Sequence, residues 1–160
     1  MHGAIVDAQK RQVAVILERI RGVVLHAFIL GGAQERNGVE CGPLARYQAM
    51  LGICKALLYM HGRHPPVVHG DVKSGNAMLE LLGDGGVNPK LLDFGCSRIH
   101  VRSARPLGGT LSWVAPEVVN DSGQVKRSAD IYSFGRLLAF IATSVPPPRG
   151  REVFGAHAAG

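Results

Sequence analysis

Residues 69–76 form one polar loop, His69-Gly70-Asp71-Val72-Lys73-Ser74-Gly75-Asn76. A carboxylate, a cation and an amide oxygen occur within this loop, directly after an apolar segment. Phosphoryl transfer needs these groups, because it depends on a carboxylate that orients the attacking hydroxyl, a cation that holds phosphate charge, and oxygen ligands for Mg²⁺. The loop is therefore a candidate site for that chemistry.

The chain after the loop predicts a β-hairpin over residues 77–92. An apolar run from Ala77 to Leu82 is separated from Lys90-Leu91-Leu92 by a glycine-rich turn at residues 83–86. Two strands of similar length would return Asp93 to the end of the hairpin that carries Asn76. We expect these two side chains to share a metal ion, since hard oxygen ligands suit Mg²⁺.

Four further elements are expected from apolar spacing and turn residues. Residues 4–21 predict an amphipathic helix, residues 23–30 a strand, residues 43–62 a helix that starts at Pro43, and residues 129–143 a last helix. The apolar face of the helix from Pro43 is expected to contain Tyr47, Leu51, Cys54, Leu57 and Leu58. The face of the last helix is expected to contain Ile131, Phe134, Leu137, Leu138 and Ile141.

Five motifs, in order over about residues 43–142, resemble the signature set of eukaryotic protein kinases. The loop at 69–76 resembles the catalytic loop, Asp93-Phe94-Gly95 the DFG motif and Ala115-Pro116-Glu117 the APE motif. Residues 109–114 resemble the substrate-binding loop, and residues 130–135 the start of the large buried helix of the C-terminal lobe.

The resemblance implies an α+β, protein-kinase-like fold. It has a mainly helical C-lobe with a small β-hairpin, and its N-lobe is largely missing. Residues 1–42 are expected to be a remnant of the N-lobe and hinge, residues 43–145 the C-lobe, and residues 146–160 a disordered tail.

The resemblance also implies roles for individual residues. Asp71 would position the substrate hydroxyl and accept its proton, Lys73 would neutralise the γ-phosphate of ATP, and Asn76 and Asp93 would hold Mg²⁺. Met78 would lie under the adenine. The remaining motif residues would have supporting roles: His69 and Phe94 in an internal hydrophobic stack, Gly95 in the DFG motif, Thr110 near Asp71, Glu117 in the APE motif, and Asp130 as a brace for the catalytic loop.

Lys73, two residues after Asp71, is typical of serine/threonine kinases, so the expected substrates are proteins that accept phosphate on serine or threonine. Trp113 and residues 130–135 resemble the tyrosine-kinase-like group of these enzymes. Gly70 replaces the usual arginine of the catalytic loop, so phosphorylation of the activation segment, at Ser97 for example, would lack its usual anchor.

Two alternatives remain. An active kinase needs a glycine-rich loop, a strand lysine and a helix glutamate in the N-lobe, and none can be located before residue 43. The chain could therefore be a truncated, non-catalytic binding module, and we expect it to bind ATP weakly. Glu117 is expected to be a buried carboxylate that has lost its arginine partner. His69, Gly70 and Asp71 also resemble the loop of aminoglycoside and choline kinases, but Lys73, Gly95 and residues 110–117 favour a protein kinase.

Composition restricts partners and location. The chain has a net charge of +6 and a pI near 9.7, yet its basic residues are dispersed and lack interleaved aromatics, which argues against a nucleic-acid partner. The longest apolar stretch, residues 23–30, is far shorter than the ~20 residues that span a bilayer. Three scattered cysteines do not form a disulfide framework. These features predict a soluble, cytoplasmic protein with no membrane partner, and they leave its oligomeric state open.

Overall fold

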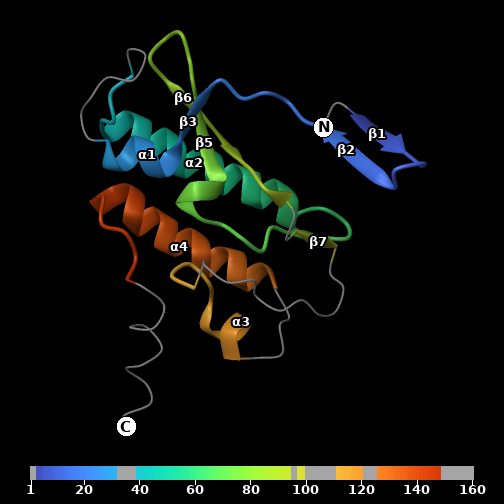
Figure 1. Cartoon of the computed structure of the whole chain (residues 1–160). Coiled ribbons are helices and arrows are strands. Elements are labelled where there is room, and N and C mark those ends of the chain that lie inside the picture. The colour runs from blue at the N-terminus through green and yellow to red at the C-terminus, as the bar shows by residue number, and fades with distance from the viewer. Residues whose placement is uncertain (1–2, 32–38, 95–96, 100–110, 121–125, 149–160) are drawn as a thin grey trace.

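The computed structural model describes residues 3–31, 39–94, 97–99, 111–120 and 126–148. Two long helices, α2 (Pro43–His61) and α4 (Arg127–Thr143), lie side by side, and a β-hairpin runs along them (Figure 1). The helices α1 (Leu25–Leu30), α3 (Pro116–Asn120) and a 3₁₀ turn η1 (Ser74–Asn76) are shorter. Short strands β4 (Val67–Val68) and β7 (Arg98–Ile99) pair antiparallel with each other. In the sequence, the loop at 69–76 lies between them.

The predicted hairpin is confirmed as β5 (Ala77–Leu81) and β6 (Val87–Leu91). Its register pairs Ala77 with Leu91 and Leu81 with Val87. A third strand, β3 (Gly22–Val24), pairs antiparallel with β5, giving the order β3-β5-β6. A Cβ atom on Gly22 would overlap the carbonyl of Leu79, so a glycine permits this close approach.

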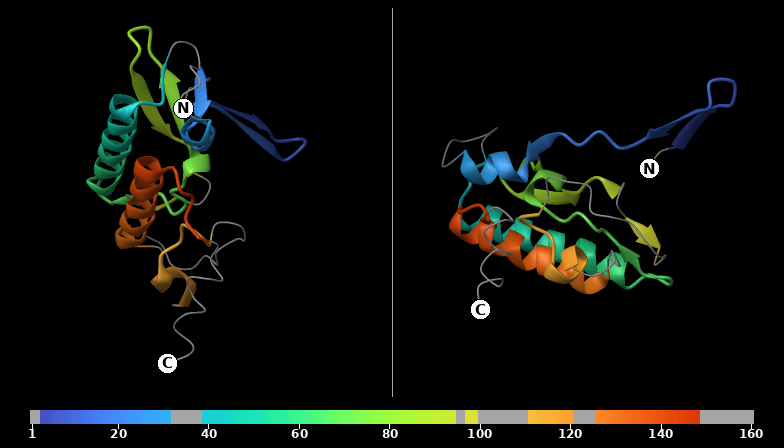
Figure 2. Two further views of the ribbon diagram at one scale, coloured as in Figure 1. Left: turned by 90° about the vertical axis from the view of Figure 1, so that its left-hand side faces the viewer. Right: turned by 60° about the horizontal axis from the view of Figure 1, so that its bottom comes forward.

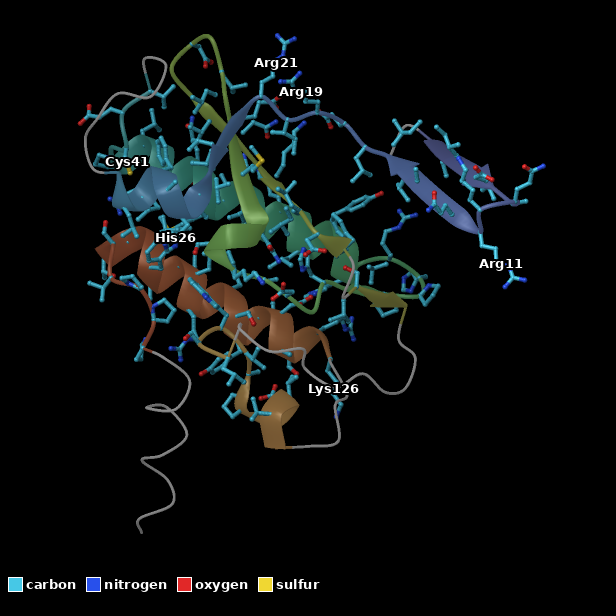
Figure 3. The ribbon with its side chains drawn as sticks, in the orientation of Figure 1. Arg11, Arg19, Arg21, His26, Cys41 and Lys126 are labelled. Carbon is cyan, nitrogen blue, oxygen red and sulfur yellow. The ribbon has the colours of Figure 1, made fainter. Side chains whose placement is uncertain are left out.

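The helix predicted over residues 4–21 is wrong. This segment forms a hairpin of β1 (Gly3–Asp7) and β2 (Gln12–Ile16), which extends to one side of the molecule (Figure 2). The turn is closed by the Lys10 N–H, which donates to Asp7 Oδ1 at 2.9 Å. Arg11, at the turn, has φ of 51° and points away from the rest of the chain (Figure 3). The helical spacing of valine and isoleucine was misleading, because β-branched residues favour strands.

The strand predicted over residues 23–30 is correct only for its first two residues. From Leu25 onward the chain is helical, and the buried residues Leu25, Phe28 and Ile29 follow the three- and four-residue spacing of a helix. A short apolar run does not distinguish a strand from a buried helix. The ring of His26 stacks on Phe140 at 5.3 Å between centroids, which joins α1 to α4.

Helix α2 is confirmed, but the predicted apolar face is wrong. Its buried residues are Ala45, Ala49, Ile53, Leu57 and Met60, so only Leu57 of the predicted set lies inside. Tyr47, Leu51, Cys54 and Leu58 are exposed. Small residues explain why the buried face differs from the predicted one. A Cβ on Gly52 would overlap the ring of Pro89, so the absence of a side chain lets β6 pack closely on the face of α2 that carries Gly52.

The core lies between α2, α4, α1 and the hairpin. Helix α4 is confirmed and contributes Leu137, Phe140 and Ile141, each fully buried, whereas the predicted core residue Ile131 is 55% exposed. Residues 149–160 of the predicted tail lie outside the described part of the chain. Within the described residues, no helix has both the length and the apolar character that a membrane span requires.

Candidate active site

The start of the loop at 69–76 is bound by Asp130, in the first turn of α4. This carboxylate is 1% exposed; its Oδ2 accepts the backbone N–H of His69 at 2.8 Å, and its Oδ1 accepts that of Gly70 at 2.9 Å. His61, the last residue of α2, places Nε2 2.8 Å from Asp130 Oδ2. Two backbone amides and one imidazole therefore fix the start of the loop to the hydrophobic core.

Gly70 adopts a backbone conformation that suits glycine. Its φ is 80°, in the left-handed region that a side chain disfavours. The chain turns here between His69, which is fully buried, and Asp71, whose side chain is partly exposed.

Asp71, Lys73 and Asn76 come together around one carboxylate oxygen. Lys73 Nζ lies 2.6 Å from Asp71 Oδ2, and Asn76 Nδ2 donates to the same oxygen at 2.7 Å and to the Asp71 carbonyl at 3.0 Å. The side chain of Asp71 is 13% exposed and that of Lys73 is 26% exposed. The carboxylate is thus fixed in orientation yet reachable from solvent.

Asn76 and Asp93 lie at the same end of the hairpin. The pairing of β5 with β6 continues one step further, because the Leu92 N–H donates to the Asn76 carbonyl at 2.8 Å. Asp93 is the next residue, is exposed, and has φ of 61°, so the chain turns sharply after the strand. Among the described residues, no three His, Cys, Asp or Glu side chains form a metal cage. A cation here would take few protein ligands.

His69 is a neutral, buried histidine. Nδ1 accepts the Asp71 N–H at 3.3 Å, so the proton resides on Nε2, which lies 3.1 Å from the Leu92 carbonyl. Desolvation by burial lowers the pKa of His69, although Asp130 and the Leu92 carbonyl act in the opposite direction. The imidazole therefore bridges the loop at 69–76 and the end of β6.

The predicted stack of His69 and Phe94 is present as a contact, with ring centroids 5.1 Å apart. It is not internal in this structure, because Phe94 is 52% exposed. The expected burial of Glu117 is also wrong, since this residue lies exposed in the first turn of α3. Met78 is half-buried on β5, opposite Lys90 and Val24. Gly95 and Thr110 lie outside the described residues.

A charged group next to β5 and β6 was not predicted. Glu18, on the segment between β2 and β3, pairs with Lys90 on β6, and Lys90 also lies 3.4 Å from Glu80. The carboxylate of Glu18, as a hydrogen-bond acceptor, raises the pKa of Lys90. This pairing attaches the segment before β3 to the hairpin, while Arg19 and Arg21 of the same segment point outward (Figure 3).

Two supporting residues were also missed. His61 bonds Asp130 from 69 positions away, and Ser133 Oγ donates to the Trp113 carbonyl at 2.7 Å. The sequence places His61 at the end of a predicted helix, close to the loop at 69–76, and this position could have suggested a supporting role. No local pattern identifies Asp130 as its partner.

The model of the protein kinase domain matches residues 3–157 of the chain. Among curated proteins, the chain is 38% identical over 115 residues to a protein named as a probable serine/threonine-protein kinase from Dictyostelium discoideum, covering 69% of this chain and 11% of that one. It is 34% identical over 143 residues to serine/threonine-protein kinase CTR1 of Arabidopsis thaliana, covering 87% and 16%. It is 31% identical over 150 residues to cold-responsive protein kinase 1 of the same plant, covering 89% and 36%. The chain thus spans a minor part of these relatives' lengths.

Proposed function

The chain belongs to the protein kinase family, and on this premise we propose that its loop at 69–76 transfers the γ-phosphoryl group of ATP to serine or threonine hydroxyls of proteins. The observation that supports this most directly is the convergence of Lys73 Nζ and Asn76 Nδ2 on Asp71 Oδ2, at 2.6 and 2.7 Å. A carboxylate held by two donors is oriented before substrate arrives, and such positioning accounts for most of catalysis in phosphoryl transfer.

Asp71 orients the attacking hydroxyl and accepts its proton as the new P–O bond forms. The two donors fix the direction of its carboxylate. Lys73 lies close enough to leave Asp71 and meet the transferred phosphoryl group, where its charge offsets the charge of the transition state. These roles explain why the cation and the carboxylate occur two residues apart on one loop.

The family uses ATP with Mg²⁺, and the residues present fit this cation. Asn76 donates through Nδ2 to Asp71, so its amide oxygen, the atom that suits a hard cation, is the one turned away from Asp71. Asp93 follows on the paired strand. We assign Asn76 and Asp93 as the Mg²⁺ ligands; the bound ion would neutralise phosphate charge. Two protein oxygens suffice, because Mg²⁺ completes its shell with phosphates and water.

Met78 would contact the adenine from β5. The second candidate function is a kinase-like module that binds partners without catalysis. The exposure of Phe94, which is 52% exposed instead of internal, favours this candidate. The two candidates differ in a measurable property, the transfer of phosphate.

The decisive experiment measures thermal shift with Mg·ATP and transfer of radiolabelled phosphate to peptides that offer serine, threonine or tyrosine. We expect a shift at millimolar ATP, transfer to serine and threonine, and a loss of about 100-fold or more in Asp71→Ala. Asp84→Ala, in the exposed turn of the hairpin, is the matched control and keeps full activity. No ATP shift and no transfer would establish the non-catalytic module. Transfer to an aminoglycoside or to choline instead of peptide would establish the small-molecule alternative.

A further inference from the structure

Helix α2 has a second apolar face, which is exposed. Leu44, Tyr47, Leu51 and Leu58 are between 38 and 73% exposed, and Cys54 is also exposed. This outer face lies opposite the buried residues of the helix, and α2 occupies the outer margin of the molecule in the left panel of Figure 2. Surface apolar residues are ordinary when scattered, but a continuous row of them marks a contact surface.

The spacing of these residues indicates what kind of surface packs on them. The five positions Leu44, Tyr47, Leu51, Cys54 and Leu58 are separated by three, four, three and four residues. This alternation is the heptad pattern of a helix that packs against another helix through knobs and holes. The row is therefore shaped for a helix of similar length and spacing.

The charges at the two ends of α2 indicate that the partner helix is its own copy. Glu40 precedes the helix, with its carboxyl carbon beside Gly42, and Arg63 follows the helix, with its guanidinium carbon 5.2 Å from the centroid of the Tyr59 ring. Arg46, in the first turn of α2, instead donates to the Ile141 carbonyl and to Ser144 Oγ at the end of α4. An antiparallel pair of identical helices brings Glu40 of each copy toward Arg63 of the other.

The heptad pattern also fixes the register of such a pair. In antiparallel packing, Leu51 of one copy faces Cys54 of the second copy, and Tyr47 faces Leu58. Arg63 then lies level with Gly42 of the second copy, next to Glu40. Lys55, the charged residue among the exposed positions of α2, is about 7.5 Å along the axis from its equivalent, close to the Debye length at physiological salt, so repulsion between the two is weak.

We propose that the outer face of α2 is a homodimer interface, in which two copies of this chain pair antiparallel through Leu44, Tyr47, Leu51, Cys54 and Leu58. The contact is isologous, as expected for a two-fold dimer. It involves one helix per copy, fewer than the roughly 20–30 residues a side of a stable interface, so the association is weak and depends on concentration. The proposal is independent of catalysis.

Sedimentation velocity tests it on the full chain. We expect the mean mass to rise from 17.0 kDa toward twice that value between low micromolar and about 200 µM protein. Leu51→Glu combined with Leu58→Glu weakens association by about tenfold or more. Leu30→Glu, at an exposed leucine on α1, is the matched control and leaves association unchanged. A constant mass of one chain across the range, or an equal effect of Leu30→Glu, would overturn the proposal.

Two further experiments, a cross-link and a charge exchange, test the register without introducing charge into the apolar row. Leu51→Cys should form an intermolecular disulfide with Cys54 under mild oxidation, and this product should vanish when Cys54→Ser is added. Glu40→Arg and Arg63→Glu should each weaken the dimer, and the double variant should restore it. A cross-link that persists without Cys54, or charge changes that act additively, would refute the antiparallel register.

Discussion

Replacement of Asp130 by alanine should destabilise the whole chain, because its carboxylate is the buried acceptor for three donors: the His69 N–H, the Gly70 N–H and His61 Nε2. Each buried donor left without an acceptor costs about 1–3 kcal/mol. Partial relaxation and access of water reduce the sum, and loss of one partner from a buried charged network costs about 3–5 kcal/mol in total. We therefore expect a loss of about 4 kcal/mol in the free energy of unfolding.

Urea unfolding followed by circular dichroism measures this loss. Thermal unfolding gives a second measure, because each kcal/mol lowers Tm by roughly 2–4 °C in a chain of this size. Asp84→Ala, on the exposed turn, is the control: it removes only the acceptor of the Gly86 N–H at 3.0 Å and should cost no more than about 1 kcal/mol. Hydrogen exchange supplies a local readout, because the His69 and Gly70 amides should exchange faster in the variant than in wild type. A loss below about 1 kcal/mol with both amides still protected would refute the assignment of Asp130 as the brace.

Three further substitutions test separate features. Gly70→Ala places a side chain at φ of 80° and should cost about 1–2 kcal/mol in urea unfolding, whereas Gly75→Ala, where space is open, should cost less than that. Phe140→Ala removes a fully buried ring and should cost about 3–5 kcal/mol, measured in the same way. His69 has a lowered pKa in the folded chain, so below about pH 6.5 the unfolded chain binds a proton that the folded chain resists. The free energy of unfolding should therefore fall as the pH drops below about 6.5, and His69 should not affect it above that pH. His69→Phe should flatten this dependence on pH. An unchanged dependence would contradict the lowered pKa of His69.

Features encoded by neighbouring residues could be predicted from the sequence. The hairpin over 77–92 was identified because its glycine-rich turn separates two apolar runs, and it places Asn76 and Asp93 at the same end. Asp71, Lys73 and Asn76 lie within one short loop, so their proximity could be expected from the sequence alone. Family resemblance supplied the roles, which remain proposals for this chain.

Features that depend on distant contacts could not be predicted. Helix α2 is apolar on both sides, so periodicity alone did not show that Ala49 and Gly52 face the interior; the close approach of Pro89 decides this. The β1–β2 hairpin was misread because the helical spacing of Val13 and Ile16 was given more weight than the preference of these residues for strands. The bond from His61 to Asp130 joins two helices, and the sequence between them gives no sign of it.

The last paired step of the hairpin, from the Leu92 amide to the Asn76 carbonyl, has a practical consequence for engineering. The separation of the two proposed metal ligands is set at that closed end and does not depend on the length of the opposite loop. The exposed turn around Gly85 could therefore accept a tag, a fluorophore site or a short inserted peptide. Such a probe would report on the hairpin from its far end while the spacing between Asn76 and Asp93 stayed constant.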